Sequence, residues 1–220
     1  MHCIVTAGPT AEPLDEVRRL TNASTGRLGI GLGGFLAGRG CRVTLLRSRL
    51  ATFQSPGEVD AAHEFTTTSE LQTRLSALAS EDVDAFFHVA AVSDFTFGKV
   101  YDRVTPGWLV ERDDRKLATG DGDLMVELKP TPKVIARLAD WFPKACRVGW
   151  KFEMDGNREH AIEAACGQIR RYGTHGCVAN GLAYGNGYGL VSGDFVCRHY
   201  DDTEALYAGL WELAKGFRAV

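Results

Sequence analysis

Short apolar runs typical of strands alternate with amphipathic helical patterns, and this alternation restricts the fold more than any other feature of the chain. Strands are expected at residues 2–7, 41–46, 63–67, 84–91, 147–152, 177–180, 190–191 and 195–199, and helices at 26–40, 69–79, 131–141, 158–172 and 202–217. Parallel strands joined through helices need right-handed crossovers, which place helices on both faces of one sheet. The chain is therefore predicted to be α/β, a Rossmann-like three-layer sandwich with a mainly parallel sheet.

The stretch between Phe95 and Leu128 departs from this alternation. It carries many charges, glycine-containing turns and an alternating run over Leu124–Leu128. Alternation of apolar and polar residues with a period of two is typical of a half-buried strand. We therefore expect a strand-containing flap at about residues 95–129, inside a single domain that spans residues 1–220.

The charge and the terminal sequence exclude several classes of partner. A net charge of −3 provides no basic field of the kind that binds nucleic acid. No apolar run approaches the ~20 residues that a membrane-spanning helix needs, and the N-terminus lacks a basic signal region. These features predict a cytoplasmic protein. The six cysteines form no Cys-x-x-Cys pair and the histidines have no ligand spacing, so reduced thiols and no structural metal are expected.

Glycines and hydroxyl groups gather between the first predicted strand and the first predicted helix. Gly8 follows the strand and lets the backbone approach a ligand at the carboxyl edge of the sheet. Ser24, Thr25, Gly26 and Arg27 lie at the start of the helix, where unpaired N–H groups and the positive end of the helix dipole attract anions. An anion site is predicted here, with a simple turn and a capped helix start as the structural alternatives.

Three later strand ends carry residues that could meet a ligand. Asp94 could hold a ribose hydroxyl, a metal ion or an amine at the carboxyl edge of the sheet. Trp150 could stack on a base, and Asn180 offers an amide where a base or ribose would lie. Each has a structural alternative: a solvated turn aspartate, a core tryptophan and a turn-forming asparagine.

Together these motifs resemble the phosphopantothenate–cysteine ligase family, whose members are also called phosphopantothenoylcysteine synthetases. The opening segment is similar to the family pattern over Thr6–Arg18 and again over Asn22–Gly29. The other family motifs are matched, in order, at Ala90–Phe95, Asp121–Ile135, Val148–Glu153 and Ala179–Asn180. The resemblance therefore spans nearly the whole chain.

Members of this family join 4′-phosphopantothenate to L-cysteine in coenzyme A biosynthesis, with CTP or ATP as co-substrate. The resemblance implies an acyl-nucleotide intermediate, loss of pyrophosphate, and attack by the cysteine amine. Mg²⁺ and cationic side chains would stabilise the charge on the phosphates. A homodimer is also implied, with the flap reaching toward the partner. Because the chain starts at the first strand, we expect no flavin and no decarboxylase domain.

The resemblance further implies roles for individual residues. Asn22 would bind the carbonyl region of the substrate and stabilise the intermediate, and Arg27 would supply the charge of the family's usual lysine. The predicted nucleotide- and phosphate-binding residues are Gly8, Thr10, Ser24, Thr25, Gly26, Asp94, Lys129, Trp150 and Asn180. No metal ligand is assigned.

The lysine-rich flap signature of the family is altered in this chain. Arg112–Lys116 occupies its place, and we assign the catalytic flap role to Lys116, with Arg112 as the alternative. Two other functions stay open: an NAD(P)-dependent Rossmann oxidoreductase, and a homologue that binds nucleotide or pantothenate derivatives without turnover. The oxidoreductase needs a short glycine turn directly before the helix, whereas a long polar segment, residues 8–25, stands there.

Overall fold

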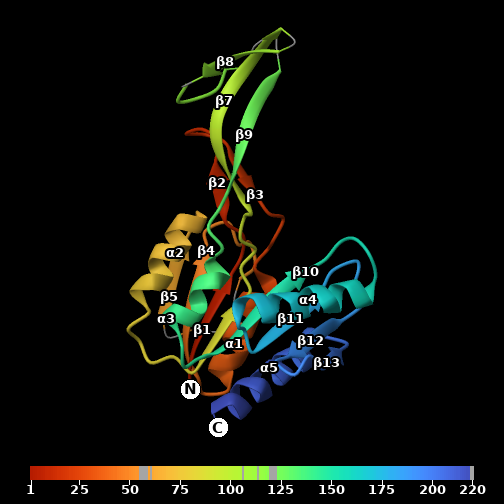
Figure 1. Cartoon of the computed structure of the whole chain (residues 1–220). Helices are drawn as coiled ribbons and strands as arrows, with labels where there is room; N and C mark the ends of the chain where they lie inside the picture. The colour runs from red at the N-terminus through yellow and green to blue at the C-terminus, as the bar shows by residue number, and fades with distance from the viewer. Residues whose placement is uncertain (55–58, 60, 106, 113, 119–122, 219–220) are drawn as a thin grey trace.

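A large mixed sheet forms the centre of the protein in a computed structural model that describes residues 1–54, 59, 61–105, 107–112, 114–118 and 123–218 (Figure 1). The strand order is β13-β12-β11-β10-β6-β1-β4-β5. The parallel strands are β1 (His2–Ala7), β4 (Arg42–Ser48), β5 (Ala61–Phe65), β6 (Ala85–His88), β10 (Cys146–Phe152) and β11 (Gly176–Asn180). Only β12 (Tyr188–Ser192) and β13 (Cys197–Tyr200), at one edge, pair antiparallel within this sheet. The predicted mainly parallel α/β sheet is confirmed.

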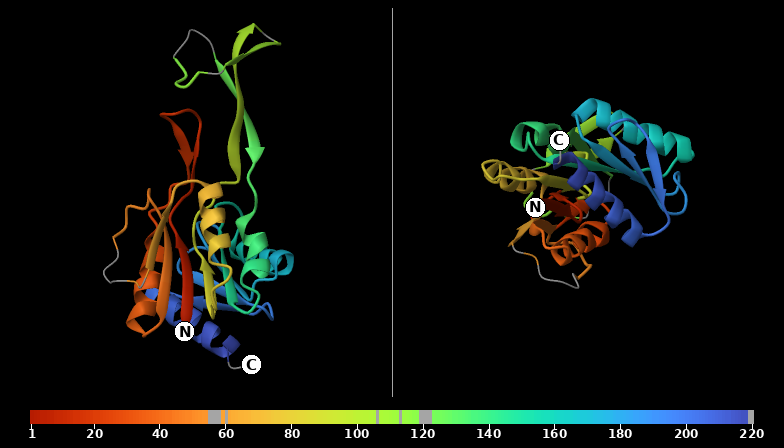
Figure 2. Two further views of the ribbon diagram at one scale, coloured as in Figure 1. Left: turned by 90° about the vertical axis from the view of Figure 1, so that its left-hand side faces the viewer. Right: turned by 90° about the horizontal axis from the view of Figure 1, so that it is seen from below.

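Helices cover both faces of this sheet, as the view from below in Figure 2 shows. The helices α1 (Arg27–Gly38) and α5 (Thr203–Arg218) pack on the face that carries Val5 and Phe87. The opposite face, with Ile4 and Phe86, is covered by α2 (Thr68–Ala77), η1 (Val134–Arg137) and α3 (Leu138–Trp141), and α4 (Arg158–Tyr172) packs on the same side of β11. Consecutive residues of a strand point to opposite faces, so the continuous apolar strands fill two cores.

Local sequence signals explain where several helices begin and how closely they pack. Thr67 caps α2 by accepting a hydrogen bond from the Glu70 N–H, as the capping pattern predicts. A Cβ atom at Gly29 would lie 2.7 Å from the Cβ of Ala7, so this glycine lets α1 approach β1 closely. The helix predicted over 131–141 is shorter than expected, because the Thr131 hydroxyl donates to the Ser93 carbonyl instead of capping a helix.

Two antiparallel elements rise from the carboxyl edge of the sheet (Figures 1 and 2). The flap contains β7 (Phe95–Thr105), β8 (Trp108–Arg112) and β9 (Leu124–Pro130), in the order β8-β7-β9. The long polar segment, residues 8–25, was expected to contain no strands, but β2 (Ala11–Pro13) and β3 (Arg19–Thr21) form a hairpin there. This hairpin separates β1 from α1, which explains the long polar segment between them.

Candidate functional site

Two glycines shape a close approach between the end of β1 and the start of α1. Gly8 and Gly26 have φ angles of 86° and 78°, in the region where only glycine is at ease. A Cβ atom at Gly26 would lie 2.9 Å from the Cβ of Ala51 and 3.3 Å from the Cα of Gly8. The two loops therefore meet closely, with both glycines buried between them.

The first turn of α1 offers N–H donors that are weakly satisfied inside the protein. Gly26 caps the helix without a side-chain hydrogen bond. The hydroxyls of Ser24 and Thr25 accept from the N–H groups of Gly26 and Arg27 only at 3.4 Å. Such donors and the helix dipole favour an anion, and the Arg27 side chain is exposed beside them. The start of α1 therefore combines weakly bonded N–H donors with an exposed cation, as the predicted anion site requires.

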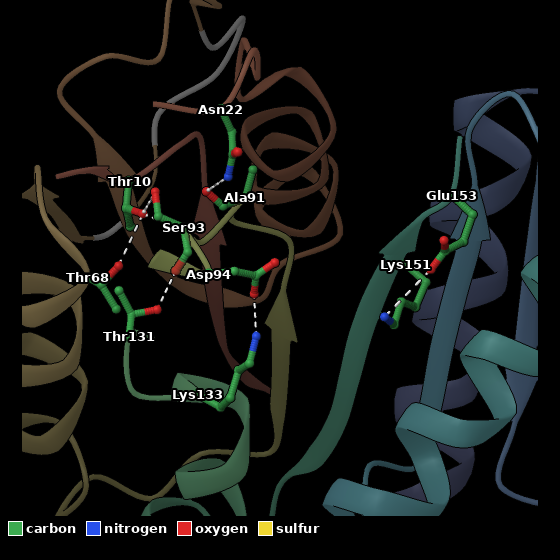
Figure 3. Close-up of polar contacts among 10 residues, drawn as sticks. All are labelled: Thr10, Asn22, Thr68, Ala91, Ser93, Asp94, Thr131, Lys133, Lys151 and Glu153. Atoms are coloured by element: carbon green, nitrogen blue, oxygen red, sulfur yellow. Dashed lines mark hydrogen bonds and ion pairs between the residues drawn. The ribbon is translucent and has the colours of Figure 1, made fainter. Parts of the chain in front are cut away.

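The end of the sheet where the loop after β1 meets the start of α1 is called the mouth below. Asn22 lies beside it, above the loop that follows β6 (Figure 3). Its Nδ2 donates to the carbonyl oxygen of Ala91 over 3.1 Å. The Thr10 N–H donates to the same oxygen over 3.1 Å, and the Ala91 N–H donates to Gly8 over 3.0 Å. These bonds connect the loop after β1 with the loop after β6. They hold the Asn22 amide in place while its side chain stays exposed.

Asp94 ends the loop after β6, and its carboxylate accepts a hydrogen bond from the ammonium group of Lys133 (Figure 3). The Thr131 N–H donates to the Asp94 carbonyl over 2.9 Å, which fixes the segment carrying Lys133 against this loop. Lys133 was not predicted as a site residue. No sequence signal pairs two residues so far apart, although both follow the carboxyl end of a strand.

Thr10 is another of the predicted binding residues. It is fully buried, and its hydroxyl is bonded inside the protein to Ser93 and Thr68 (Figure 3). Its side chain therefore stabilises the loop after β6 from inside the protein.

Trp150 and Asn180 lie farther along the carboxyl edge. Trp150 packs on the core beneath α1 and α5, which favours the structural alternative of a core tryptophan. Asn180 lines a cavity of about 400 Å³, together with Phe152, Leu182, Tyr188, Asp201 and Asp202 among others. Burial raises the pKa of Tyr188, and the charge of Arg27 opposes this effect. The two aspartates give the cavity an acidic lining, which suits amino or hydroxyl groups better than phosphates.

The cationic flap residues differ in their partners. Arg112 is held by Asp102 and Asp114, and these hydrogen bonds raise its pKa. Lys129 pairs with Glu127 over 3.4 Å. Lys116 is exposed and has no ion pair within the described part of the chain. The free charge of Lys116 is consistent with its assignment over Arg112.

A clamp from the β2–β3 hairpin fixes the segment around Lys116. The carboxylate of Asp15 accepts from the Leu117 N–H over 3.1 Å, and the Arg18 guanidinium donates to the Leu117 carbonyl. Burial would raise the pKa of Asp15, but N–H donors, first that of Arg18, lower it below its usual value. This part of the flap is therefore docked on the hairpin.

Other titratable groups are structural. All six cysteines are free thiols, and burial raises the pKa of Cys146 to about 12. Within the described residues, no cluster of three or more His, Cys, Asp or Glu side chains could hold a metal ion, and no helix is long and apolar enough to cross a membrane. Asp121, part of a predicted motif, lies outside the described residues.

Comparison with known families and proteins gives consistent results. A model of the family described as the DNA/pantothenate metabolism flavoprotein C-terminal domain matches residues 1–194. The chain is 36% identical over 197 residues to the coenzyme A biosynthesis bifunctional protein CoaBC of Thermococcus kodakarensis, a match covering 87% of this chain and 45% of that protein. The chain spans about half the length of the curated relatives it matches.

Two solved structures share the fold. The DNA/pantothenate metabolism flavoprotein from Streptococcus pneumoniae has a TM-score of 0.84 at 24% identity and covers 99% of both chains. A Cab2 mutant in complex with phosphopantothenate-cysteine has a TM-score of 0.75 at 20% identity, over 99% of this chain and 87% of that one. At these identities the likeness concerns the fold alone.

Proposed function

The chain belongs to the family of the DNA/pantothenate metabolism flavoprotein C-terminal domain, and on this premise we propose that it joins 4′-phosphopantothenate to L-cysteine with CTP or ATP. The observation that carries the proposal is the meeting of three features at one mouth of the sheet. They are the weakly bonded N–H groups at the start of α1, the amide of Asn22, and the carboxylate of Asp94. The names of the CoaBC relatives and the ligand of the Cab2 complex support the same substrates.

The chemistry would take place in two steps at this mouth. In the first, a carboxylate oxygen of phosphopantothenate attacks the α-phosphorus of the nucleotide, and the bond to pyrophosphate breaks. In the second, the cysteine nitrogen attacks the acyl carbon, the nucleoside monophosphate leaves, and the nitrogen loses a proton. Both steps build negative charge on oxygen atoms, which preorganised N–H donors and cations stabilise. The first turn of α1 and Arg27 would serve the phosphates, and the Asn22 amide the acyl oxygen.

The nucleoside would extend from this mouth toward the acidic cavity. Asp94 would accept from a ribose hydroxyl, and Asn180 and the cavity aspartates would accept from amino groups of the base. Mg²⁺ bound by the triphosphate would neutralise charge on the leaving pyrophosphate. Such an ion would be held chiefly by phosphate oxygens and water, so it would need no cluster of protein ligands.

The flap would complete the site with Lys116 and contribute to a homodimer. Three flap side chains that are apolar and exposed, Val104, Leu109 and Val110, support a contact with a second copy.

The test is pyrophosphate release by the purified chain with Mg²⁺, cysteine and either CTP or ATP. Release that depends on phosphopantothenate, and faster with one nucleotide, is the expected result. Protection of the protein by phosphopantothenate and nucleotide without any release would favour the non-catalytic binder. The oxidoreductase alternative predicts NAD(P)H binding, which we expect to be absent.

A further inference from the structure

A buried carboxylate lies behind the proposed active site and has no role in the chemistry described so far. Glu12 of β2 is only 5% exposed. Its Oε1 accepts from the backbone N–H of Thr68 over 2.9 Å and from the Thr68 hydroxyl over 2.7 Å. Burying a carboxylate costs free energy unless hydrogen bonds compensate for the lost water. The two hydrogen bonds from Thr68, at the start of α2, provide this compensation.

Three hydroxyl groups lie between this carboxylate and the loop after β6, and Figure 3 shows their side chains, Thr68, Thr10 and Ser93. The Oγ1 of Thr68 lies 3.2 Å from the Oγ1 of Thr10, which lies 3.1 Å from the Oγ of Ser93 and accepts from the Ser93 N–H over 2.8 Å. Each hydroxyl has one hydrogen to donate. Thr68 gives its hydrogen to the carboxylate, because that bond is shorter and charge-assisted. The second, longer contact of the Thr68 hydroxyl is to the Thr10 hydroxyl, and Thr10 donates to the Oγ of Ser93.

With this arrangement the Thr10 hydroxyl is fully used, donating once and accepting twice. The carboxylate of Glu12 thus holds one end of a connected chain of hydroxyl groups. Ser93, at its other end, stands between Ala91, the acceptor of the Asn22 amide, and Asp94.

We propose that Glu12 and Thr68 are positioning residues for the ligase reaction: through the chain Ser93–Thr10–Thr68–Glu12 they hold the loop that orients Asn22 and Asp94. The proposal rests on the proposed function. It adds two residues that contact no substrate. One of them, Glu12, is a buried carboxylate that anchors the chain of neutral hydroxyl groups.

The chain offers a closely matched pair of variants for a test. Thr68→Val removes the central hydroxyl and keeps the shape of the side chain, and Thr68→Ser restores the hydroxyl. Thr44→Val is the control, because Thr44 is equally buried, at 2%, and its hydroxyl has a contact to lose, with the His2 ring over 3.0 Å. His2 begins β1, so this contact lies at the opposite end of the sheet.

The expected result, well below the melting temperatures, is a kcat about tenfold lower for Thr68→Val, recovery in Thr68→Ser, and wild-type kcat for Thr44→Val. Equal kcat in Thr68→Val and Thr44→Val would overturn the proposal. If Thr68→Val does not fold, Ser93→Ala, which removes only the end of the chain, should lower kcat, and an unchanged kcat would count against us.

Amide hydrogen exchange separates this proposal from the proposed function. If the wild type forms no product, the proposed function fails on its own. The positioning proposal would still predict faster exchange at Ser93 in Thr68→Val than in Thr44→Val. Equal exchange at Ser93 in the two variants would contradict it.

Discussion

Replacing Asn22 with aspartate tests how the acyl group is handled. In the structure one Nδ2 hydrogen is donated to Ala91 and the exposed amide faces the mouth. Asn22→Asp removes both donor hydrogens and places a carboxylate oxygen against the Ala91 carbonyl. Because the side chain is exposed, the loss in the free energy of unfolding should stay near ~1 kcal/mol. Losing a donor to a developing oxyanion costs about 2.7–4 kcal/mol in activation free energy, or roughly 10²- to 10³-fold in rate.

The second half-reaction should carry most of this loss, since the acyl oxygen gains its charge when the cysteine amine attacks. Single-turnover quenching would measure pyrophosphate release and product formation separately. Asn22→Ala is the control that removes the amide without adding charge, and it should slow the second step while leaving nucleotide binding nearly intact. Equal slowing of both steps, or no slowing of either, would refute this role for Asn22.

Three further predictions concern the cradle, the flap and pH. Gly26→Ala should lower the free energy of unfolding by about 2–4 kcal/mol, because alanine is strained at a positive φ and its Cβ would lie 2.9 Å from that of Ala51. Gly38→Ala has open space around it and should not destabilise the protein. Chemical denaturation measures both variants, and equal stability of the two would contradict the prediction. Lys116→Gln should slow pyrophosphate release about tenfold or more with little effect on stability, and unchanged turnover would move the role to Arg112 or another cation. Burial lowers the pKa of His88 to about 4. The buried neutral ring therefore contributes stability that is fully present above the unfolded pKa of about 6.5 and is lost as the pH falls toward 4. The loss in the free energy of unfolding over this range should be about 3 kcal/mol. Denaturation at pH 7 and pH 4.5 should show a smaller pH effect in His88→Gln than in the wild type, and equal effects would contradict it.

The periodic patterns were sufficient to predict the central sheet and most helices. Strand β1 and helix α4 have the predicted bounds. A continuous apolar run and an amphipathic stripe show directly which residues are buried, and this is enough to locate such elements. The hairpin β2–β3 was missed because its strands are three residues long and largely exposed in β3, leaving no periodicity to detect. The start of the helix after Thr131 was placed wrongly, since a threonine hydroxyl can bond a distant carbonyl as well as a helix N–H.

The site shows the same division between local and long-range information. Gly8 and Gly26 could be proposed from the sequence because a glycine at a strand end or a helix start has a local structural meaning, and both have positive φ angles. Lys133 and Thr68 were missed because their partners, Asp94 and Glu12, are brought near only by the sheet topology. Single-residue chemistry could not reveal that the Thr10 side chain points inward, although it lies in the predicted motif.

The most direct test of the central claim is a crystal structure of the chain with nucleotide, Mg²⁺ and phosphopantothenate. The account predicts a phosphate within hydrogen-bond distance of the N–H groups at Gly26 and Arg27, with the pantothenate carboxylate beside Asn22 and a ribose hydroxyl on Asp94. Phosphates bound away from the start of α1, with Asn22 still joined only to Ala91, would contradict it.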